Sequence, residues 1–310
     1  MKPLYVHQKG QVFLEGNGLK VTDLPGEFQK YFPKEDPKYI DPVSLLAGIA
    51  AGRAFEEQKR PLESGTAGDF AVVVGSGFGA IDSTVDFDAQ ALQKGPNAVN
   101  PMDFPNTVAN AAGSRIGIWL QLKGPNVTLT NGGTSFLDAI GFAWEAYNSG
   151  LFGDCLVGAV EKVPVFLKSF PAQETPDVRW REGACLFRAS GDERLGFLFE
   201  IVDYFSLQLK ADFSFTSPFR ERFENFWTGV EWLGFPQGTP LEPLLPKGIT
   251  RFSPEPSVME VGLGGSNSLD SFLAGSASKG IVGVFSKAER KCSFVKIHQK
   301  GREKNGNDGN

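Results

Sequence analysis

Short apolar runs alternate with amphipathic stretches along the first 190 residues of the chain. Helical spacing of apolar residues predicts helices at 41–58, 114–122 and 135–148, and apolar runs predict strands at 70–74, 127–130, 155–160 and 184–188. Uninterrupted apolar strands are typical of a sheet that is covered on both faces. The pattern therefore predicts an α/β fold with a largely interior sheet.

A second set of elements follows. The pattern predicts strands at 195–205, 258–263, 280–285 and 293–297 and helices at 218–233 and 266–274, with a Pro- and Gly-rich loop at 234–256. The polar segment 301–310 predicts a disordered tail. Because nothing resembles a linker between independent modules, we expect two closely packed halves, 1–190 and a shorter 191–300.

The overall charge limits the choice of partner. With 41% hydrophobic and 22% charged residues the chain can bury a large core, and its net charge of −5 argues against nucleic acid or an anionic membrane as a partner. No apolar run reaches the roughly 18–20 residues of a membrane span, and the start lacks a signal-peptide layout. We expect a cytoplasmic protein. A local basic patch would still suffice for an acidic carrier protein.

Cysteine and histidine are scarce. Cys155, Cys185 and Cys292 are widely spaced with no CxxC, so neither a disulfide framework nor a metal site is expected. The two histidines, His7 and His298, lie near opposite ends of the chain. The middle of the sequence therefore lacks any imidazole for catalysis.

The segment GSGFGA, residues 75–80, follows a predicted strand and fits the spacing G-x-G-x-x-A. A dinucleotide site would also need a second strand about 20 residues on that ends in an acidic residue. The sequence instead continues into GPNAVNPMDFP, which is too rich in Pro and Asn for a buried strand. We interpret the glycines as a turn at a strand end and expect no cofactor.

The segment TLTNGGTSFLDAI predicts a sharp elbow between a strand and a helix. Such elbows present nucleophiles, because the helix N-terminus stabilises negative charge. The tip is Gly132-Gly133, which presents no side chain, and a hydroxyl of Thr134 or Ser135 would need a neighbouring base. The simpler interpretation is a tight turn followed by an N-cap from Thr134 or Ser135.

Four collinear patterns, VVVGSGFGAI, NPMDFPNTVANAAGSRIGIWLQLKGPNVTLTNGGTSFLDAI, GLFGDCLVGAVE and REGACLF, resemble the N-terminal half of β-ketoacyl synthases. The resemblance covers about residues 40–205 and continues more weakly beyond. It implies a thiolase-like fold, in which two related halves form a layered α-β-α-β-α arrangement, here with a shortened second half.

The same resemblance places Gly133 where the family has its acyl-accepting cysteine. The family's two catalytic histidines are also missing, and the segment GLGGSNSLDSFLAG faintly resembles the helix start that carries one of them, with Ser266 at its position. Condensation needs a thiolate and imidazoles, neither of which this chain supplies at these positions. Backbone N–H groups near Gly133 would still be able to bind a thioester carbonyl.

Cysteine-less members of that family, called chain-length factors, pair with an active ketosynthase. The resemblance implies such a heterodimer, or a homodimer, with an acyl carrier protein as a further partner. It places the segment 104–110 at the subunit contact and suggests a set of tunnel or interface residues: Phe104, Trp119, Asn131, Gly132, Gly133, Thr134 and Ser135. Two alternatives stay open: a residual acyl-thioester decarboxylase or hydrolase that uses Ser135, Thr134 or Asp138, and a module that binds an acyl chain or carrier protein.

Overall fold

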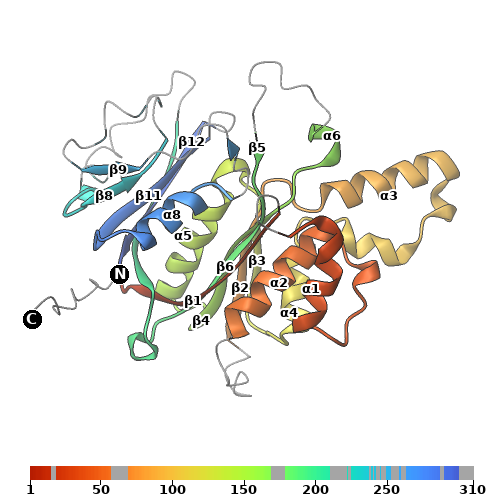
Figure 1. Ribbon diagram of the computed structural model, residues 1–310, viewed down its shortest axis with the longest axis horizontal. Helices are drawn as coiled ribbons and strands as arrows, with labels where there is room; N and C mark the ends of the chain where they lie inside the picture. Colours follow the sequence, from red (N-terminus) through yellow and green to blue (C-terminus); the bar gives the residue numbers. More distant parts are fainter. Residues whose placement is uncertain are drawn as a thin grey trace, which may run out of the picture.

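The computed structural model describes residues 1–14, 19–56, 69–168, 179–209, 222, 225–236, 239, 241, 245, 249–252, 258–259, 263–286 and 290–299. Its dominant feature is a ten-stranded sheet with the order β3-β2-β4-β6-β1-β7-β12-β11-β8-β9 (Figure 1). The strands are β1 (Leu4–Leu14), β2 (Phe70–Gly75), β3 (Asn126–Leu129), β4 (Asp154–Glu161), β6 (Glu182–Ser190), β7 (Phe199–Gln208), β8 (Trp232–Gly234), β9 (Thr250–Phe252), β11 (Lys279–Ser286) and β12 (Lys291–His298). A small parallel pair is formed by β5 (Arg179–Trp180) and β10 (Val258–Met259).

Strand β1 joins the two halves of the sheet. It pairs antiparallel with β6 along most of its length and with β7 through its first residues. The sequence pattern did not predict this strand, because polar residues interrupt its apolar positions. Lys9 contributes to the assembly by forming an ion pair with Asp270 of helix α8 (Ser266–Ala274).

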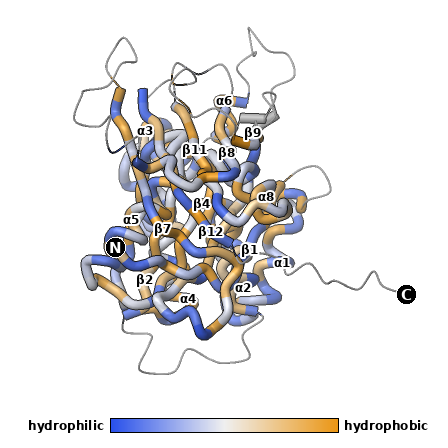
Figure 2. Tube along the Cα trace, turned by 90° about the vertical axis from the view of Figure 1, so that its left-hand side faces the viewer, coloured by the Kyte–Doolittle hydropathy of each residue, from blue (hydrophilic) through white to orange (hydrophobic). Residues whose placement is uncertain are grey.

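Helices pack in separate layers on the strands. Helices α1 (Leu24–Tyr31), α2 (Pro42–Glu56) and α4 (Ala111–Trp119) share one apolar cluster with strands of the first half. Helix α5 (Ser135–Asn148) contacts β2 and β4 of the first half and also β7 and β12 of the second half. Apolar segments gather along these interior elements in Figure 2. Helix α5 is therefore the central element that both halves bury.

Most predicted elements are present. Helices α5 and α8 have the predicted bounds, and the strands predicted at 70–74, 127–130, 155–160, 184–188, 280–285 and 293–297 are found within one or two residues of their predicted ends. The strand predicted at 195–205 instead starts at Phe199, after a 3-10 turn, and α4 starts three residues before its predicted position.

Other predictions were wrong or lie outside the described residues. The loop predicted at 234–256 contains strand β9. Of the helix predicted at 218–233, residues 222 and 225–226 are helical, its last residues belong to strand β8, and residues 218–221 and 223–224 lie outside the described part. Of the strand predicted at 258–263, residues 258–259 form β10 and residue 263 lies in a turn, while residues 260–262 lie outside the described part. The predicted disordered tail, 301–310, also lies outside the described residues.

Helix α3 (Ile81–Lys94) projects from the body of the molecule as an arm (Figure 1). The chain returns from it through the 3-10 helix η4 (Pro101–Asn106), and none of the α3 side chains is buried. The arm is held by a Phe87–Phe104 ring contact with centroids 6.1 Å apart and by a 2.7 Å hydrogen bond from the Thr84 hydroxyl to the Thr107 carbonyl. The sequence pattern predicted no helix here.

Among the helices of the described residues, none combines the length and apolar character that crossing a membrane requires.

Candidate functional site

The predicted elbow is present between β3 and α5. After β3 the chain makes one 3-10 turn, η5 (Gly132–Thr134), and enters α5 at Ser135. Gly132 has φ +56, a left-handed conformation in which a side chain would be strained. Gly75, at the end of β2, packs so tightly against the start of α5 that an added Cβ would lie 2.3 Å from the Ser135 carbonyl oxygen. Glycines at these two positions therefore shape the elbow.

Gly133 occupies the tip of this elbow beside the end of strand β11. A Cβ added at Gly133 would lie 3.5 Å from both Cβ and Oγ of Ser286, which is ordinary van der Waals contact. The position therefore has room for a small side chain, and the fold does not by itself require glycine there.

The two hydroxyls beside Gly133 are fully occupied with structural hydrogen bonds. Ser135 is buried, and its Oγ accepts from the Asn131 N–H at 2.9 Å and lies 2.8 and 3.0 Å from the carbonyl oxygens of Gly132 and Ser76. Thr134 is buried as well, with its Oγ1 2.8 Å from the Asp138 carboxylate and 3.1 Å from the Asn131 carbonyl. Thr134 stands at the N-cap position of α5, but its side chain makes no capping hydrogen bond, and Ser135 is already the first residue of the helix, so the predicted side-chain N-cap was wrong. Both hydroxyls instead close the elbow by bonding Asn131, Gly132, Ser76 and Asp138, and neither presents its oxygen to solvent.

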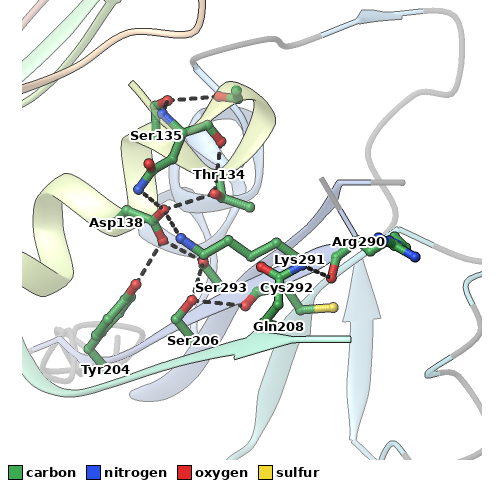
Figure 3. Close-up of polar contacts among 12 residues, drawn as sticks. Thr134, Ser135, Asp138, Tyr204, Ser206, Gln208, Arg290, Lys291, Cys292 and Ser293 are labelled. Atoms are coloured by element: carbon green, nitrogen blue, oxygen red, sulfur yellow. Dashed lines mark hydrogen bonds and ion pairs between the residues drawn. The ribbon is translucent and has the colours of Figure 1, made fainter. Parts of the chain in front are cut away.

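Asp138, one turn into α5, is the centre of a polar network that joins the two halves (Figure 3). Its Oδ2 accepts from Asn131 Nδ2 at 2.7 Å and Thr134 Oγ1 at 2.8 Å, and it forms an ion pair with Lys291 Nζ at 2.5 Å. Its Oδ1 accepts from Tyr204 at 2.7 Å and from Ser293 at 2.5 Å. These five donors saturate the carboxylate.

The network determines the protonation of its members. Burial alone would raise the pKa of the Asp138 carboxyl, but the hydrogen bonds from Lys291, Ser293 and Tyr204 outweigh it and hold that pKa below its ordinary value. Burial and the neighbouring Asp138 charge raise the pKa of the Tyr204 hydroxyl. Asp138 is thus charged at neutral pH, and its oxygen lone pairs are occupied by hydrogen bonds within the fold. A general base needs a carboxylate with a free lone pair, so Asp138 does not fit that role.

Both histidines lie at the opposite end of the strands from the elbow. His7 on β1 is hydrogen-bonded to Ser190, which lies opposite the first residue of β4. The elbow lies beside the last residue of β2, and β2 runs parallel to β4, so the elbow is at the other end of these strands. His298 pairs with Lys279, the first residue of β11, and its Nδ1 is 3.2 Å from Glu200. Neither imidazole can serve the elbow as a base.

The glycine turn at residues 75–80 binds a carboxylate of the chain itself. Glu161, at the end of β4, accepts from the Gly77 N–H at 2.5 Å and the Phe78 N–H at 3.3 Å, and the Ser76 hydroxyl is 3.4 Å away. Burial raises the pKa of Glu161 to about 8, against the opposing effect of these hydrogen bonds. The N–H groups that a dinucleotide phosphate would need are therefore already in use.

The two aromatic candidates lie in different surroundings. Trp119 packs against Phe28 and Phe32, with ring centroids 4.8 and 5.3 Å apart, and is partly buried against the core between α1, α2 and α4. Phe104 lies in η4, beside the arm, and is 57% exposed. Phe104 is thus accessible to a partner, whereas Trp119 is partly buried against the core of its own chain.

Ser266 is buried as the first residue of α8. The preceding Gly265 has φ +91, and a Cβ added there would lie 3.3 Å from Leu137 Cδ2. The start of α8 therefore packs beside the start of α5, near the elbow.

Sequence reasoning missed the partners of Asp138 that come from the second half. Tyr204 lies on β7, and Lys291 and Ser293 lie on β12. The available signal was the polar residue at 138 on an otherwise apolar helix face, which requires partners when buried. Sequence alone does not say which strands supply them. Among the described residues there is also no group of three or more His, Cys, Asp or Glu that could hold a metal ion.

Comparison with known proteins identifies relatives of the chain. The model of the family "Beta-ketoacyl synthase, N-terminal domain" matches residues 13–169. The 3-oxoacyl-[acyl-carrier-protein] synthase 2 of Vibrio cholerae is 28% identical over 173 residues, which cover 55% of this chain and 42% of that protein. The enzyme of the same name from Vibrio harveyi is 28% identical over 153 residues, 48% of this chain and 37% of that protein. The chain thus aligns with less than half the length of these relatives.

Similar solved structures share the fold over 96% of the chain. One is the ishigamide ketosynthase/chain length factor, with a TM-score of 0.74 and 16% identity over 96% of this chain and 100% of that one. Another is a type II PKS acyl-carrier protein in complex with its ketosynthase, with a TM-score of 0.73 and 16% identity over 96% and 99% of the two chains. At such identities these structures establish the fold alone. The thiolase-like fold expected from the sequence is confirmed.

Proposed function

Because the chain belongs to the β-ketoacyl synthase family, we propose that it is a non-catalytic, chain-length-factor-like subunit that pairs with an active ketosynthase in type II fatty acid or polyketide biosynthesis. One observation carries the proposal. The elbow tip is Gly133, and the neighbouring hydroxyls of Thr134 and Ser135 are buried and committed to structural hydrogen bonds. The elbow keeps its shape and offers no nucleophile.

The geometry argues against a residual decarboxylase or hydrolase. Such an enzyme would use Ser135, Thr134 or Asp138, and all three are buried within hydrogen-bond networks. A serine or threonine nucleophile also needs a neighbouring base, and both imidazoles lie at the far end of the strands. Catalysis by any of these three groups would require the hydrogen bonds that hold the elbow to be broken.

Pairing is supported by the surface beside the arm. A groove of about 730 Å³ lies next to the arm and is lined by a row of apolar side chains: Tyr39, Ile40, Met102, Pro105, Val108 and Ile118. Several are strongly exposed, among them Met102 at 74% and Ile118 at 72%. Exposed apolar surface of this kind marks an interaction site in soluble proteins. The groove includes residues of the segment 104–110, for which we predict the subunit contact.

Carrier-protein binding and acyl-chain binding are kept as secondary parts of the proposal. The similar ketosynthase structures include one in complex with its acyl-carrier protein. We infer that this chain contributes to such a complex through its partner subunit. The alternative, a module that holds an acyl chain or a carrier protein without a ketosynthase, predicts a retained acyl ligand in native mass spectrometry of the isolated chain.

The test is co-purification and reconstitution. The chain is co-expressed with a cysteine-bearing ketosynthase from the same genome, and the complex is analysed by native mass spectrometry. We expect a one-to-one heterodimer, and we expect product length to change when the chain is omitted. The isolated chain should show no turnover of malonyl- or acyl-carrier protein. A strict homodimer from the native host, or turnover by the isolated chain, would contradict the proposal.

A further inference from the structure

The arm presents an apolar stripe that nothing in the described part of the chain covers. Val85 is 47% and Leu92 is 87% exposed, and with Ala89 they follow the i, i+4, i+7 spacing of one helix face. The opposite face of α3 carries Thr84 and Phe87, which hold η4. The stripe therefore points away from the chain's own packing.

Acidic residues flank this stripe. Asp86 and Asp88 are exposed neighbours of Val85 on the helix surface. Asp82, at the base of the arm, is already paired with Lys162 at 2.7 Å. A surface that buries the stripe must therefore place cations opposite Asp86 and Asp88, or bury them at a cost.

The chain's own apolar groove does not meet this requirement. Three charged residues line the groove: Glu35, Asp36 and Arg115. The Arg115 guanidinium donates to the Asn106 side chain and lies 4.0 Å from Asp41, so its charge is already compensated. A symmetric pair of copies that placed each arm in its mate's groove would bring aspartates against Glu35 and Asp36.

We propose that the stripe docks into an apolar groove of a partner protein bordered by Lys and Arg side chains, and that a second copy of this chain is not its occupant. The identity of the partner as a ketosynthase rests on the proposed function. The mismatch in charge between the arm and the groove of this chain does not depend on the proposed function, and it can be tested on the isolated chain.

The first experiment measures self-association of the purified chain by sedimentation velocity at low salt. We expect the wild type to stay monomeric. Reversing the charge of the arm with Asp86→Lys/Asp88→Asn, or the charge of the groove with Glu35→Lys/Asp36→Asn, should make the two surfaces complementary. Either change should strengthen self-association at least tenfold. Asn at position 36 keeps the N-cap that Asp36 provides to the Lys38 N–H. The added association should disappear in about 0.5 M NaCl.

The combined variant with all four substitutions makes both surfaces basic and should therefore be monomeric again. If the single-surface variants associated non-specifically, the combined variant would associate as well. Glu145→Lys/Glu193→Gln changes the net charge by the same amount on exposed residues elsewhere and should have no effect. A wild-type dimer that resists salt would overturn the proposal. Single-surface variants that behave like the control would overturn it as well.

The second experiment uses the ketosynthase complex. Asp86→Lys/Asp88→Asn should weaken it at least tenfold and reduce the salt dependence of its Kd, while Glu145→Lys/Glu193→Gln leaves both unchanged. A complex indifferent to the arm substitutions would overturn the docking proposal while leaving the proposed function intact. If no ketosynthase binds at all, the proposed function fails, and the self-association measurements still decide whether the two surfaces of this chain are mismatched.

Discussion

The Lys291 ammonium lies 2.5 Å from the Asp138 carboxylate and thereby ties strand β12 of the second half to helix α5 of the first. The two side chains are 20% and 4% exposed. A charge in such surroundings is stable only with its full set of partners. The pair therefore couples the integrity of the elbow to the packing of both halves.

Substitution Asp138→Asn should destabilise the protein by about 3 kcal/mol, because it removes one member of a buried ion pair and leaves Lys291 uncompensated. The measurement is urea unfolding at neutral pH. Asp192→Asn, which alters a surface aspartate with a 35% exposed side chain paired with Arg194, is the control and should change the midpoint little. An Asp138→Asn midpoint equal to that of the control would show that the network adds no stability.

The same pair predicts a loss of stability in acid. The folded-state pKa of Asp138 is depressed, so its contribution is fully present above the unfolded-state value near 4 and is lost as pH falls through the lower folded-state pKa. At pH values below about 4, the urea midpoint of the wild type should therefore fall more steeply with decreasing pH than the midpoint of Asp138→Asn. Parallel profiles for the two proteins would refute this assignment.

Introducing a thiol at the elbow tip tests whether the position is accessible. Since a Cβ at Gly133 would only touch Ser286 at 3.5 Å, Gly133→Cys should fold normally. The native cysteines Cys155, Cys185 and Cys292 are buried, so native protein should take up no iodoacetamide and the variant should take up one equivalent. The measurement is intact mass after labelling without denaturant.

The same variant separates acylation from condensation. Gly133→Cys should accept an acyl group slowly from a thioester, because a thiolate alone suffices for exchange. It should not elongate malonyl-carrier protein, because no imidazole of the described residues lies near the elbow. Elongation by the variant alone would mean that other residues of the chain supply the missing acid–base function.

Glu161 predicts a second pH effect of opposite sign. Its folded-state pKa is raised to about 8, so stability is highest below the unfolded-state value near 4.5 and falls as pH rises towards 8. One such group contributes up to about 1.4 kcal/mol per pH unit within that window. Glu161→Gln, which keeps an acceptor for the Gly77 N–H, should flatten the wild-type decline between about pH 5 and 8. Equal slopes in both proteins would show that Glu161 is charged in the folded state.

The local pattern was enough to predict α5, α8 and the elbow that leads from the sheet into α5, because periodicity and glycine positions act within a few residues. It failed for β1, in which polar residues such as Gln8 and Lys9 interrupt the apolar positions, and for α3, which buries none of its side chains. The absence of a nucleophilic side chain at Gly133 could be predicted from the sequence motif alone. The saturation of Asp138 was not, because Tyr204 and Ser293 reach it from strands far along the chain.

Gly75→Ala tests the close packing of β2 against the elbow. The added methyl would lie 2.3 Å from the Ser135 carbonyl oxygen, so either the strand or the start of α5 must shift, at an expected cost of about 1–3 kcal/mol or more. Gly153→Ala is the matched control, because nothing lies within 4 Å of its added Cβ and its φ is not positive. The measurement is the urea midpoint of each variant, together with the rate at which iodoacetamide labels the introduced thiol in a Gly133→Cys background. We expect Gly75→Ala to lower the midpoint and change the labelling rate while Gly153→Ala does neither, because only position 75 supports the elbow. Equal midpoints and rates for the two variants would contradict this packing.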